Sequence, residues 1–212
     1  MATRSILIVD DHALARAGFA EILHSAGLDL DVRQAGDADT ALQMLRAAPV
    51  QLLIVDLSLP GRSGLELLRH VRATHPGLPV LVLSGFPERQ YALNVLKAGA
   101  RGYLSKSCTA EQLAEAVTTL LKGGRYLSSE TAELLVGETL GGGEGPRHAQ
   151  LSEREFDIFL KLATGQGTTQ VANLLYLSPK TVSTYRTRIL EKLEMKTNAE
   201  LTRYALEHGL IQ

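Results

Sequence analysis

Short apolar runs alternate with amphipathic segments over the first 122 residues of the chain. We predict strong strands at Ser5–Val9, Leu52–Val55 and Val80–Leu83 and weaker ones at Asp31–Ala35 and Gly102–Leu104. Continuous apolar runs of this length are typical of strands buried on both faces of a parallel sheet. Helical spacing between them predicts helices at Ala13–Ser25, Thr40–Ala47, Leu65–Val71, Tyr91–Ala98 and Ala110–Leu121. These strand–helix repeats predict an α/β fold with a doubly wound five-stranded parallel sheet.

The pattern changes after residue 122. Gly123 and Gly124 are placed to end the preceding helix as a C-cap, and Ser128–Val136 predicts a short helix. The stretch "GETLGGGEGPRHAQ" (Gly137–Gln150) is rich in Gly and has little apolar periodicity, which is typical of a flexible linker. We therefore divide the chain into a front domain (1–122), a linker (123–150) and a second domain (151–212).

The second domain has helical patterning throughout. Its predicted helices cover "EFDIFLKLATG", which ends at Gly165, then Thr169–Leu175, "LSPKTVSTYRTRILEKL" and "AELTRYALEHG". Their start signals are the capping boxes Ser152 with Glu155 and Thr197 with Glu200, and the N-cap Ser178 before Pro179. Four short helices with a tight link before the third predict an all-α four-helix domain that contains a helix-turn-helix.

Composition adds modest constraints. The chain has 45% hydrophobic and 21% charged residues and a formal net charge of −1, which is ordinary for a globular protein. Residues 1–146 hold 13 Lys and Arg against 16 Asp and Glu, whereas residues 147–212 hold 9 against 7, so the second domain suits an anionic partner. The single cysteine, Cys108, excludes an intrachain disulfide, and no apolar run reaches the ~18 residues of a membrane span. We expect a soluble, cytoplasmic protein with no membrane partner.

Polar side chains follow the predicted strands. Asp10 and Asp11 come after the first, Asp56 after the third, Ser84 after the fourth and Lys106 after the fifth. The carboxyl ends of parallel strands meet at one edge of a sheet, so we expect these groups to converge there. Three carboxylates in one place repel one another, and a hard cation relieves that repulsion. The residues therefore predict a Mg²⁺ site.

This set of groups also suits phosphoryl transfer. A carboxylate can attack phosphorus and hold an acyl phosphate, while Mg²⁺ and an ammonium neutralise the charge of the transferring group. We favour Asp56 as the nucleophile because the turn-rich loop "LSLPGRSG" that follows would hold it open to a phosphodonor. The alternative is structural: Asp10 and Asp11 would cap the next helix and Asp56 would only end its strand.

The helix from Pro179 to Leu193 has the composition of a recognition helix. Its predicted buried side consists of Val182, Ile189, Leu190 and Leu193. Its predicted exposed side offers basic and hydroxyl groups to phosphates and base edges, namely Lys180, Thr181, Ser183, Thr184, Arg186, Thr187, Arg188 and Lys192. An ordinary solvated helix face is the alternative, and the preceding short helix and tight turn favour DNA.

Together these residues resemble a known family over nearly the whole chain. The motifs are "VDDH", "DLSLPGRSGLELL", "VLVLSG", "KAGARGYLSK" and the tail "LSEREFDIFLKLATG…LSPKTVSTYRTRILEKL…AELTRYA". In this order and spacing they resemble a two-component response regulator of the NarL/FixJ class. The resemblance implies a flavodoxin-like receiver domain, a linker and a LuxR-type helix-turn-helix.

The resemblance also implies roles for single residues of the front domain. Asp56 matches the phosphoacceptor, and Lys106 matches the lysine that pairs with the phosphoryl group. Asp11 and Asp56, with the backbone carbonyl of Ser58, match the Mg²⁺ ligands, and Asp10 acts mostly through water.

Further positions match the family's switch. Ser84 matches the switch hydroxyl and Tyr103 the aromatic that reorients with it; a half-buried aromatic beside a strand is the alternative for Tyr103. Phe86 lies where the family controls water access, so we predict that it slows hydrolysis of the phosphoaspartate. His12 is interpreted as helix-start structure and not as a ligand.

The implied function is that of a transcription factor and not of an enzyme. A sensor histidine kinase would phosphorylate Asp56, and the modification would control dimerisation and binding to promoter DNA, with RNA polymerase as a further partner. In the second domain, Ser183 and Tyr185 replace the Lys and His of many members, which affects base preference. Leu201, Tyr204 and Ala205 are candidate contacts of a homodimer, with packing inside the domain as the equal alternative.

Three competing functions differ in the residues that they need. A phosphatase of the haloacid dehalogenase type needs a second Asp two residues after its nucleophile, where this chain has Ser58. A Rossmann domain needs a Gly-rich turn after the first strand, where this chain has "DDHALAR". A receiver that binds DNA without phosphorylation keeps all of these motifs and stays open.

Overall fold

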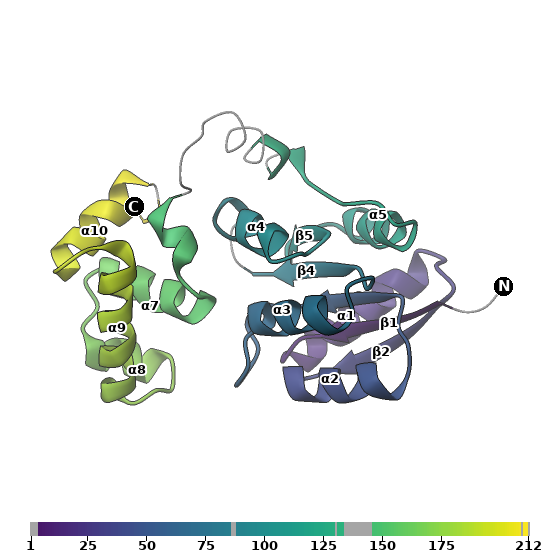
Figure 1. Cartoon of the computed structure of the whole chain (residues 1–212), viewed down its shortest axis with the longest axis horizontal. Helices are drawn as coiled ribbons and strands as arrows, with labels where there is room; N and C mark the ends of the chain where they lie inside the picture. The colour runs from purple at the N-terminus through teal and green to yellow at the C-terminus, as the bar shows by residue number, and fades with distance from the viewer. Residues whose placement is uncertain (1–3, 86–87, 130, 134–145, 209, 212) are drawn as a thin grey trace. The chain divides into compact units, whose positions relative to one another are not determined.

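A computed structural model describes residues 4–85, 88–129, 131–133, 146–208 and 210–211. In the front part of the chain a five-stranded parallel sheet has the order β2-β1-β3-β4-β5 (Figure 1). The strands are β1 (Arg4–Val9), β2 (Leu30–Ala35), β3 (Leu52–Val55), β4 (Val80–Ser84) and β5 (Gly102–Ser105). All neighbouring pairs are parallel, and β1 is in register with β3 from Ile6 beside Leu52 to Val9 beside Val55. The predicted doubly wound fold is confirmed.

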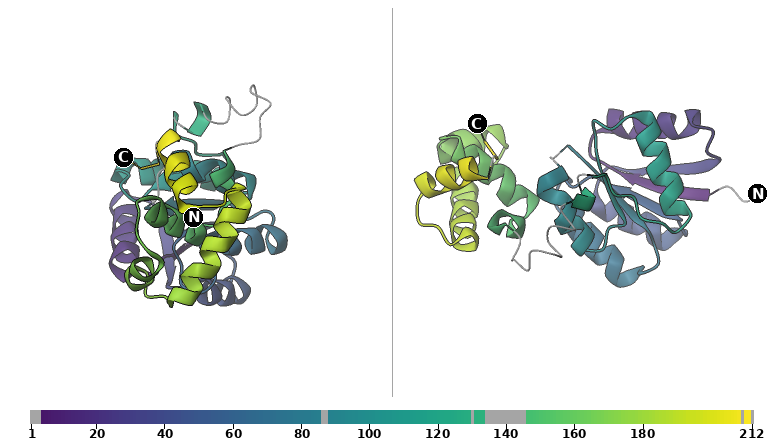
Figure 2. Two further views of the ribbon diagram at one scale, coloured as in Figure 1. Left: turned by 90° about the vertical axis from the view of Figure 1, so that its left-hand side faces the viewer. Right: turned by 90° about the horizontal axis from the view of Figure 1, so that it is seen from above.

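Helices cover both faces of this sheet (Figures 1 and 2). They are α1 (Ala13–Ser25), α2 (Ala38–Ala47), α3 (Gly64–Thr74), α4 (Glu88–Lys97) and α5 (Ala110–Leu121). One continuous apolar core joins α1 and α5 to the sheet, with Phe19, Leu23 and Leu113 packed among Ile6 and Ile8. Burial of both sheet faces explains why β1, β3 and β4 consist almost entirely of Val, Ile and Leu.

Local capping sets the helix starts that apolar spacing alone misplaced. The helix predicted from Thr40 begins at Ala38, because the Asp37 side chain accepts a hydrogen bond from the Thr40 amide at 2.8 Å. The helix predicted from Leu65 begins at Gly64, because Ser63 and Glu66 form a capping box. At the far end of the domain Gly123 has a φ of +85°, so it ends α5 in the left-handed conformation as predicted.

The segment after α5 packs back onto the sheet. Tyr126 bridges to Gly102 in parallel, and its amide donates to the Arg101 carbonyl at 3.0 Å. Further along, the hydroxyls of Ser128 and Thr131 donate to the Glu88 carboxylate on α4. Within the predicted helix Ser128–Val136, residues 129 and 131–133 are helical, and the rest of its end lies outside the described residues. The chain separates into two compact units, Met1–Gly142 and Gly143–Gln212, while the finer domain limits stay a prediction.

The second unit is helical, as predicted. It contains α7 (Glu153–Ala163), α8 (Thr168–Leu174), α9 (Pro179–Leu193) and α10 (Asn198–Glu207), preceded by a 3-10 helix, η1 (Arg147–Gln150). The capping box of Ser152 with Glu155 is present, and Ser178 caps α9 as predicted. The second predicted box is half right: Thr197 accepts from the Glu200 amide, but the Glu200 carboxylate accepts from the Lys196 amide at 2.6 Å.

In the described part of the chain, no helix combines the length and the apolar composition that a membrane span requires.

Candidate functional site

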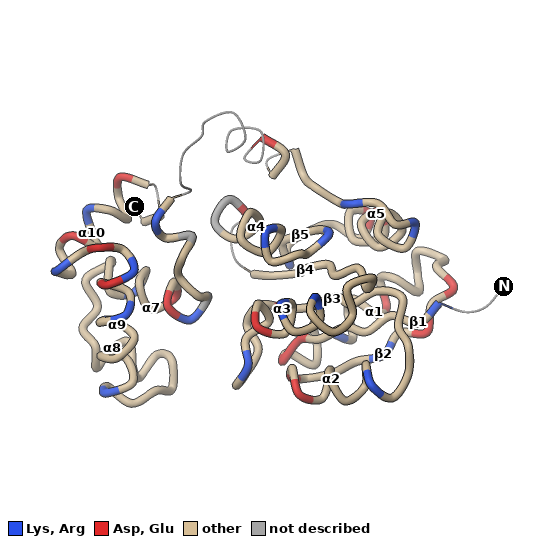
Figure 3. The backbone as a smooth tube through the Cα atoms, viewed as in Figure 1, with Lys and Arg blue, Asp and Glu red and all other residues tan. Residues whose placement is uncertain are grey.

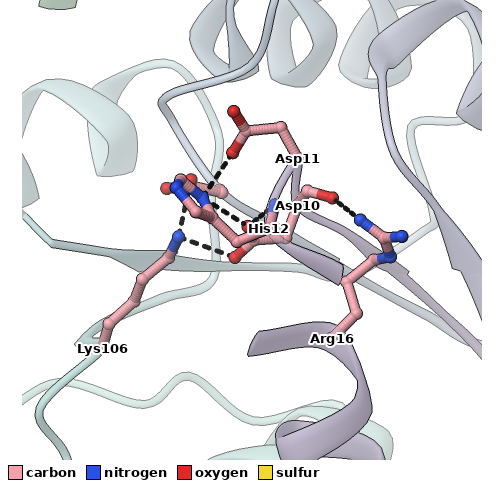
Figure 4. A network of polar contacts seen from close by, with 6 residues as sticks. Asp10, Asp11, His12, Arg16 and Lys106 are labelled. Atoms are coloured by element: carbon pink, nitrogen blue, oxygen red, sulfur yellow. Dashed lines mark hydrogen bonds and ion pairs between the residues drawn. The ribbon is translucent and has the colours of Figure 1, made fainter. Parts of the chain in front are cut away.

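The carboxyl ends of β1, β3 and β5 bring three charged side chains together (Figure 4). The Lys106 ammonium lies 2.7 Å from Asp10 Oδ2 and 2.7 Å from Asp56 Oδ2. The Asp10 and Asp56 side chains are 3% and 1% exposed. Each of the three residues directly follows a strand, so the parallel sheet itself aligns them. The predicted convergence on one sheet edge is present.

Asp11 and His12 form the outer rim of this cluster. His12 Nδ1 lies 2.6 Å from Asp11 Oδ1 and 3.4 Å from Asp10 Oδ1, and the His12 amide donates to Asp10 Oδ1 at 2.8 Å. His12 is the N-cap residue of α1, as its interpretation as helix-start structure required, and its side chain makes no capping bond. The carboxylate of Asp10 contacts Lys106 and the turn before α1, so helix capping does not account for its position.

Burial and charge act in opposite directions on these groups. Burial raises the pKa of the Asp56 carboxyl, and the nearby Asp10 charge adds to this, while Lys106 opposes it. Burial alone would lower the pKa of the Lys106 ammonium, but its hydrogen bonds to Asp10 and Asp56 outweigh that effect and raise it. One ammonium thus contacts two buried carboxylates. The three groups together still carry a net negative charge.

The cluster has the donor set of a cation site. Ligand atoms of Asp10, Asp11, His12 and Asp56 all lie within 4.8 Å of one another. Asp56 Oδ1 is buried and has no hydrogen-bond partner among the described residues. An unpaired buried carboxylate oxygen beside two other carboxylates suits a hard divalent ion with oxygen ligands. Receiver domains in general bind Mg²⁺ at an acidic site of this kind.

The loop after Asp56 packs against the Asp56 backbone. A Cβ added at Gly64 would lie 2.0 Å from the Asp56 carbonyl oxygen, so the start of α3 rests directly on the Asp56 backbone. The Gly64 amide donates to the Leu57 carbonyl at 3.0 Å and closes the loop. The Asp56 side chain is 1% exposed, so in this conformation the carboxylate is buried and not open to a phosphodonor as expected.

Three further predicted residues of the front unit, Ser84, Tyr103 and Ser58, lie in the strands of the sheet or in the loop after Asp56. Ser84 is fully buried at the end of β4, and its carbonyl accepts from the Lys106 amide at 2.8 Å. Tyr103 lies in β5 and is 1% exposed, so it is more deeply buried than the half-buried alternative supposed. Ser58 is exposed two residues after Asp56, and Phe86 lies outside the described residues.

Sequence reasoning missed two residues of this site. Gly64 carried a usable signal, since a Gly between an N-cap Ser and an apolar helix suggests close packing. Arg16, on α1, donates from Nη1 to the Asp10 carbonyl. Nothing in the sequence marked Arg16, because its position on a helix of mixed polarity predicts only solvent exposure.

The second unit presents the predicted surface on α9. The apolar set is confirmed, since Val182, Ile189, Leu190 and Leu193 are buried. On the other side a shallow depression of about 310 Å³ is lined by Ser178, Lys180, Thr181, Thr184, Tyr185 and Arg188. Figure 3 shows basic residues along α9. Lys180, Ser183, Thr184, Thr187 and Arg188 are exposed, and Thr181 is half-buried.

The side chains of two predicted contact residues join α9 to other helices of the unit. Arg186 Nε donates to Asn198 Oδ1 at 2.7 Å, which ties α9 to the start of α10. Lys192 Nζ lies 2.5 Å from Oε2 of Glu155, whose side chain is 5% exposed. These two side chains therefore support the domain, whereas Lys180 and Arg188 face outward.

The candidate dimer residues are core residues. Leu201 and Ala205 are fully buried, and Tyr204 is 8% exposed. The Tyr204 hydroxyl lies 3.0 Å from Nδ1 of the buried His148, in η1. Packing inside the domain, the alternative stated for these residues, is what the structure shows.

Comparisons with known proteins agree with this geometry. Residues 6–118 match the response regulator receiver domain, and residues 149–205 match the bacterial regulatory proteins of the luxR family. The chain is 39% identical over 209 residues to the transcriptional activator protein ExaE of Pseudomonas putida, covering 98% of each protein. It is 35% identical over 208 residues to the response regulator UvrY of Escherichia coli K12, covering 97% of this chain and 95% of UvrY.

A solved structure extends the likeness to the fold. RcsB from Salmonella enterica serovar Typhimurium, bound to promoter rprA in the presence of phosphomimetic BeF3⁻, has a TM-score of 0.60 and 25% identity and covers 95% of this chain and 98% of that chain. The matched families are regulatory, which agrees with the expectation of a regulator and not an enzyme. The chain belongs to the response regulators of the NarL/FixJ class, with a receiver domain and a LuxR-type DNA-binding domain.

Proposed function

We propose that Asp56 accepts a phosphoryl group from a sensor histidine kinase and that this modification controls dimerisation and binding to promoter DNA. The observation that carries the proposal is the Lys106 ammonium, 2.7 Å from both Asp10 and Asp56 at the carboxyl edge of the sheet. A half-buried cation at this place would neutralise charge on a group bound to Asp56, as phosphoryl transfer requires. Asp56 Oδ1, which lacks a hydrogen-bond partner among the described residues, is the oxygen best placed to react.

The same residues fit a magnesium ion. Asp10, Asp11 and Asp56, with the backbone carbonyl of Ser58, would hold it, Asp10 mostly through water. When bound, Mg²⁺ would neutralise charge on the phosphoryl oxygens and reduce the repulsion between the carboxylates. The unpaired buried oxygen of Asp56 and the short spacing of the cluster support this assignment. Asp11 would have to release His12 to take part, since their side chains are 2.6 Å apart.

The transfer step needs no acid or base from the protein. An Asp56 carboxylate oxygen forms a bond to phosphorus while the bond from phosphorus to the donor nitrogen of the kinase histidine breaks. The electron pair of that bond stays on the imidazole, which takes a proton from water. Lys106 keeps its proton throughout and pairs with the phosphoryl oxygens. Because the Asp56 side chain is 1% exposed, the groups around it have to rearrange before the donor can approach.

Phosphorylation would then change the surface of the receiver. It adds about −1.5 to −2 units of charge and three acceptor oxygens to a buried position. Ser84 and Lys106 would move toward these oxygens, with Tyr103 reorienting in β5, and α4, β5 and α5 would shift to a second packing. The Glu88 carboxylate on α4 accepts from Ser128 and Thr131, so a shift of α4 would reach the segment that leads to the second unit.

The second unit would bind DNA through α9. Lys180, Thr181, Ser183, Thr184, Arg186, Thr187, Arg188 and Lys192 are the proposed contacts, with the outward-facing Lys180 and Arg188 as the strongest candidates. A homodimer would place two such helices about one DNA turn apart. RNA polymerase is a further proposed partner of the promoter-bound dimer.

Incubation of the full chain with Mg²⁺ and acetyl phosphate tests the proposal. We expect one phosphoryl group per chain by mass spectrometry, no gain in Asp56→Asn, and a normal gain in Asp39→Asn, which changes a carboxylate outside the cluster. Chromatography with light scattering and fluorescence anisotropy on promoter fragments would then compare the dimer fraction and the DNA affinity before and after modification. A chain that binds DNA equally in both states would be a receiver without a phosphorylation switch, and many turnovers per chain would indicate a phosphatase.

A further inference from the structure

Asp10 is held from two opposite sides (Figure 4). On one side its carboxylate contacts Lys106 at 2.7 Å and accepts from the His12 amide at 2.8 Å. On the other side its backbone carbonyl accepts a hydrogen bond from Nη1 of Arg16. The carboxylate contacts belong to the site already described, whereas the hydrogen bond from Arg16 goes to the backbone carbonyl and engages neither carboxylate oxygen.

The position of Arg16 explains how the chain turns at this point. β1 ends at Val9 and α1 begins at Ala13, so the turn has three residues. At the end of β1, the Asp10 amide still donates a hydrogen bond to the Ala35 carbonyl of β2 at 3.2 Å. Past that contact the Asp10 carbonyl has no ladder partner. Arg16, on the first turn of α1, reaches back and supplies the missing donor. The guanidinium also lies beside the loop after β2, since a Cβ added at Gly36 would be 3.7 Å from Nη1.

The charge of Arg16 suits this role. Three carboxylates of the site repel one another, and Arg16 brings a permanent positive charge to the Asp10 backbone without occupying a ligand oxygen. Its Nε is buried and has no partner among the described residues, so hydrogen bonding alone does not account for its burial. A buried donor without a partner, such as this Nε, is expected beside a charged site where function and not packing has selected the arrangement.

We propose that Arg16 is a positioning residue of the acidic site: by fixing the Asp10 carbonyl it sets the directions of the Asp10 and Asp11 carboxylates and so strengthens Mg²⁺ binding. The inference rests on the proposed function only for the identity of the ion. Arg16 does not touch the phosphoryl group, so its loss changes how much Mg²⁺ the site needs and has little effect on the transfer step once the ion is bound.

Isothermal titration of the full chain with Mg²⁺ tests this directly. Arg16→Ala should weaken Mg²⁺ binding about tenfold, and Arg16→Lys, which keeps the charge and one donor, should bind within about threefold of the wild type. At saturating Mg²⁺ the maximal rate of phosphoryl uptake from acetyl phosphate should fall less than threefold in both variants. Arg33→Ala, which removes an arginine on β2 that pairs with Asp31 at 2.9 Å, is the matched control and should leave the Mg²⁺ affinity unchanged.

Circular dichroism establishes that each variant is folded, and if Arg16→Ala is not, Arg16→Met keeps the aliphatic stem and answers the same question. Equal Mg²⁺ affinity in the wild type and in the folded variant would overturn the role of Arg16. A loss of maximal rate with unchanged Mg²⁺ affinity would overturn it as well. A wild type that binds Mg²⁺ but gains no phosphoryl group would instead contradict the proposed function, and the affinity comparison would still decide the inference.

Discussion

The two functional surfaces of this protein are built in opposite ways. At the acidic edge, Asp10, Asp56 and Lys106 come from separate strand ends, and the two carboxylates are at most 3% exposed. On α9, Lys180 and Arg188 lie about two turns apart on one helix and face outward. The first surface depends on tertiary packing, so single changes should have large and coupled effects. The second is local and solvated, so single changes should have small, additive and salt-dependent effects.

Gly64→Ala should have the largest effect. The new methyl group would lie 2.0 Å from the Asp56 carbonyl oxygen, so the backbone of the acidic edge has to move. We expect a loss of about 2–4 kcal/mol in the free energy of unfolding of the receiver unit, measured by denaturant titration, and a strong loss of phosphoryl uptake. Gly77→Ala is the control, because a Cβ at Gly77 meets nothing within 4 Å. Wild-type stability and uptake in Gly64→Ala would contradict this account.

Lys192→Ala distinguishes the α9 side chains that stabilise the helical unit from those proposed to contact DNA. The Glu155 side chain, 5% exposed, would lose the ammonium that lies 2.5 Å away. An unpaired carboxylate at such a buried position should destabilise the helical unit by about 2–3 kcal/mol, a value that allows for the 39% exposure of the Lys192 side chain. Hydrogen exchange of α7 and α9 amides would measure this. Lys161→Ala removes a pairing at 3.1 Å with Asp157, whose side chain is 24% exposed, and should have a much smaller effect.

These two examples show where prediction from sequence stops. Apolar spacing gave the bounds of α1 and α5 without error, because both helices bury one continuous face against the sheet. Capping residues corrected the start of α3, since a Ser-x-x-Glu pattern acts within one turn. The contact of Gly64 with Asp56 and the pairing of Lys192 with Glu155 join segments that only the folded chain brings together, so no local pattern encodes them.

The candidate sites follow the same division. The end of each parallel strand is visible in the sequence, so Asp10, Asp56 and Lys106 were predictable as one group. The burial of the Asp56 side chain was not predictable, because it depends on how segments distant in the sequence pack together. On α9 helical periodicity predicted which side is buried, but it could not tell that Arg186 would turn toward Asn198.

The helical unit should lose stability in mild acid. Burial, with the charge of His208 as a second cause, lowers the pKa of His148 to about 4. The folded unit therefore keeps His148 neutral, and the stability it contributes is fully present above the unfolded-state pKa of about 6.5 and is lost as the pH falls toward 4. We expect a loss of about 2 kcal/mol across this range, after allowing for screening by nearby water.

NMR titration of the His148 ring nitrogens in the full chain would test the cause directly. The rings of Phe156, Tyr204 and His208 lie around this ring, and the Tyr204 hydroxyl lies 3.0 Å from its Nδ1. Tyr204→Phe removes that contact while keeping the ring, so it tests whether the hydroxyl holds His148 neutral. Titration of His148 near pH 6.5 in the wild type would refute the proposed buried neutral state.

Arg188→Ala should weaken DNA binding modestly. Its exposed side chain lines the depression on α9, so the variant should keep the wild-type melting temperature. We expect a loss of about 1 kcal/mol in binding and a decrease of about one in the slope of log affinity against log salt. Fluorescence anisotropy at several salt concentrations measures both. If Lys161→Ala, an equal change of charge on α7, lowers the slope as much, then net charge and not α9 contact is responsible.

The smallest effect concerns the segment that joins the two regions. Glu88 on α4 accepts from Ser128 and the buried Thr131, so Glu88→Ala removes the acceptor that holds this segment to the receiver. Both hydrogen bonds share one oxygen of Glu88, so we take them together as worth about 1 kcal/mol, and hydrogen exchange of residues 126–133 should rise about fivefold. Glu133→Ala, at an exposed position of the same segment, should leave that exchange unchanged. If phosphorylation acts through α4, it should raise hydrogen exchange in this segment of the wild type. It should add little in Glu88→Ala, because the contact that it would release is already absent. An equal rise in hydrogen exchange in both chains would mean that the signal reaches the DNA-binding unit by another route.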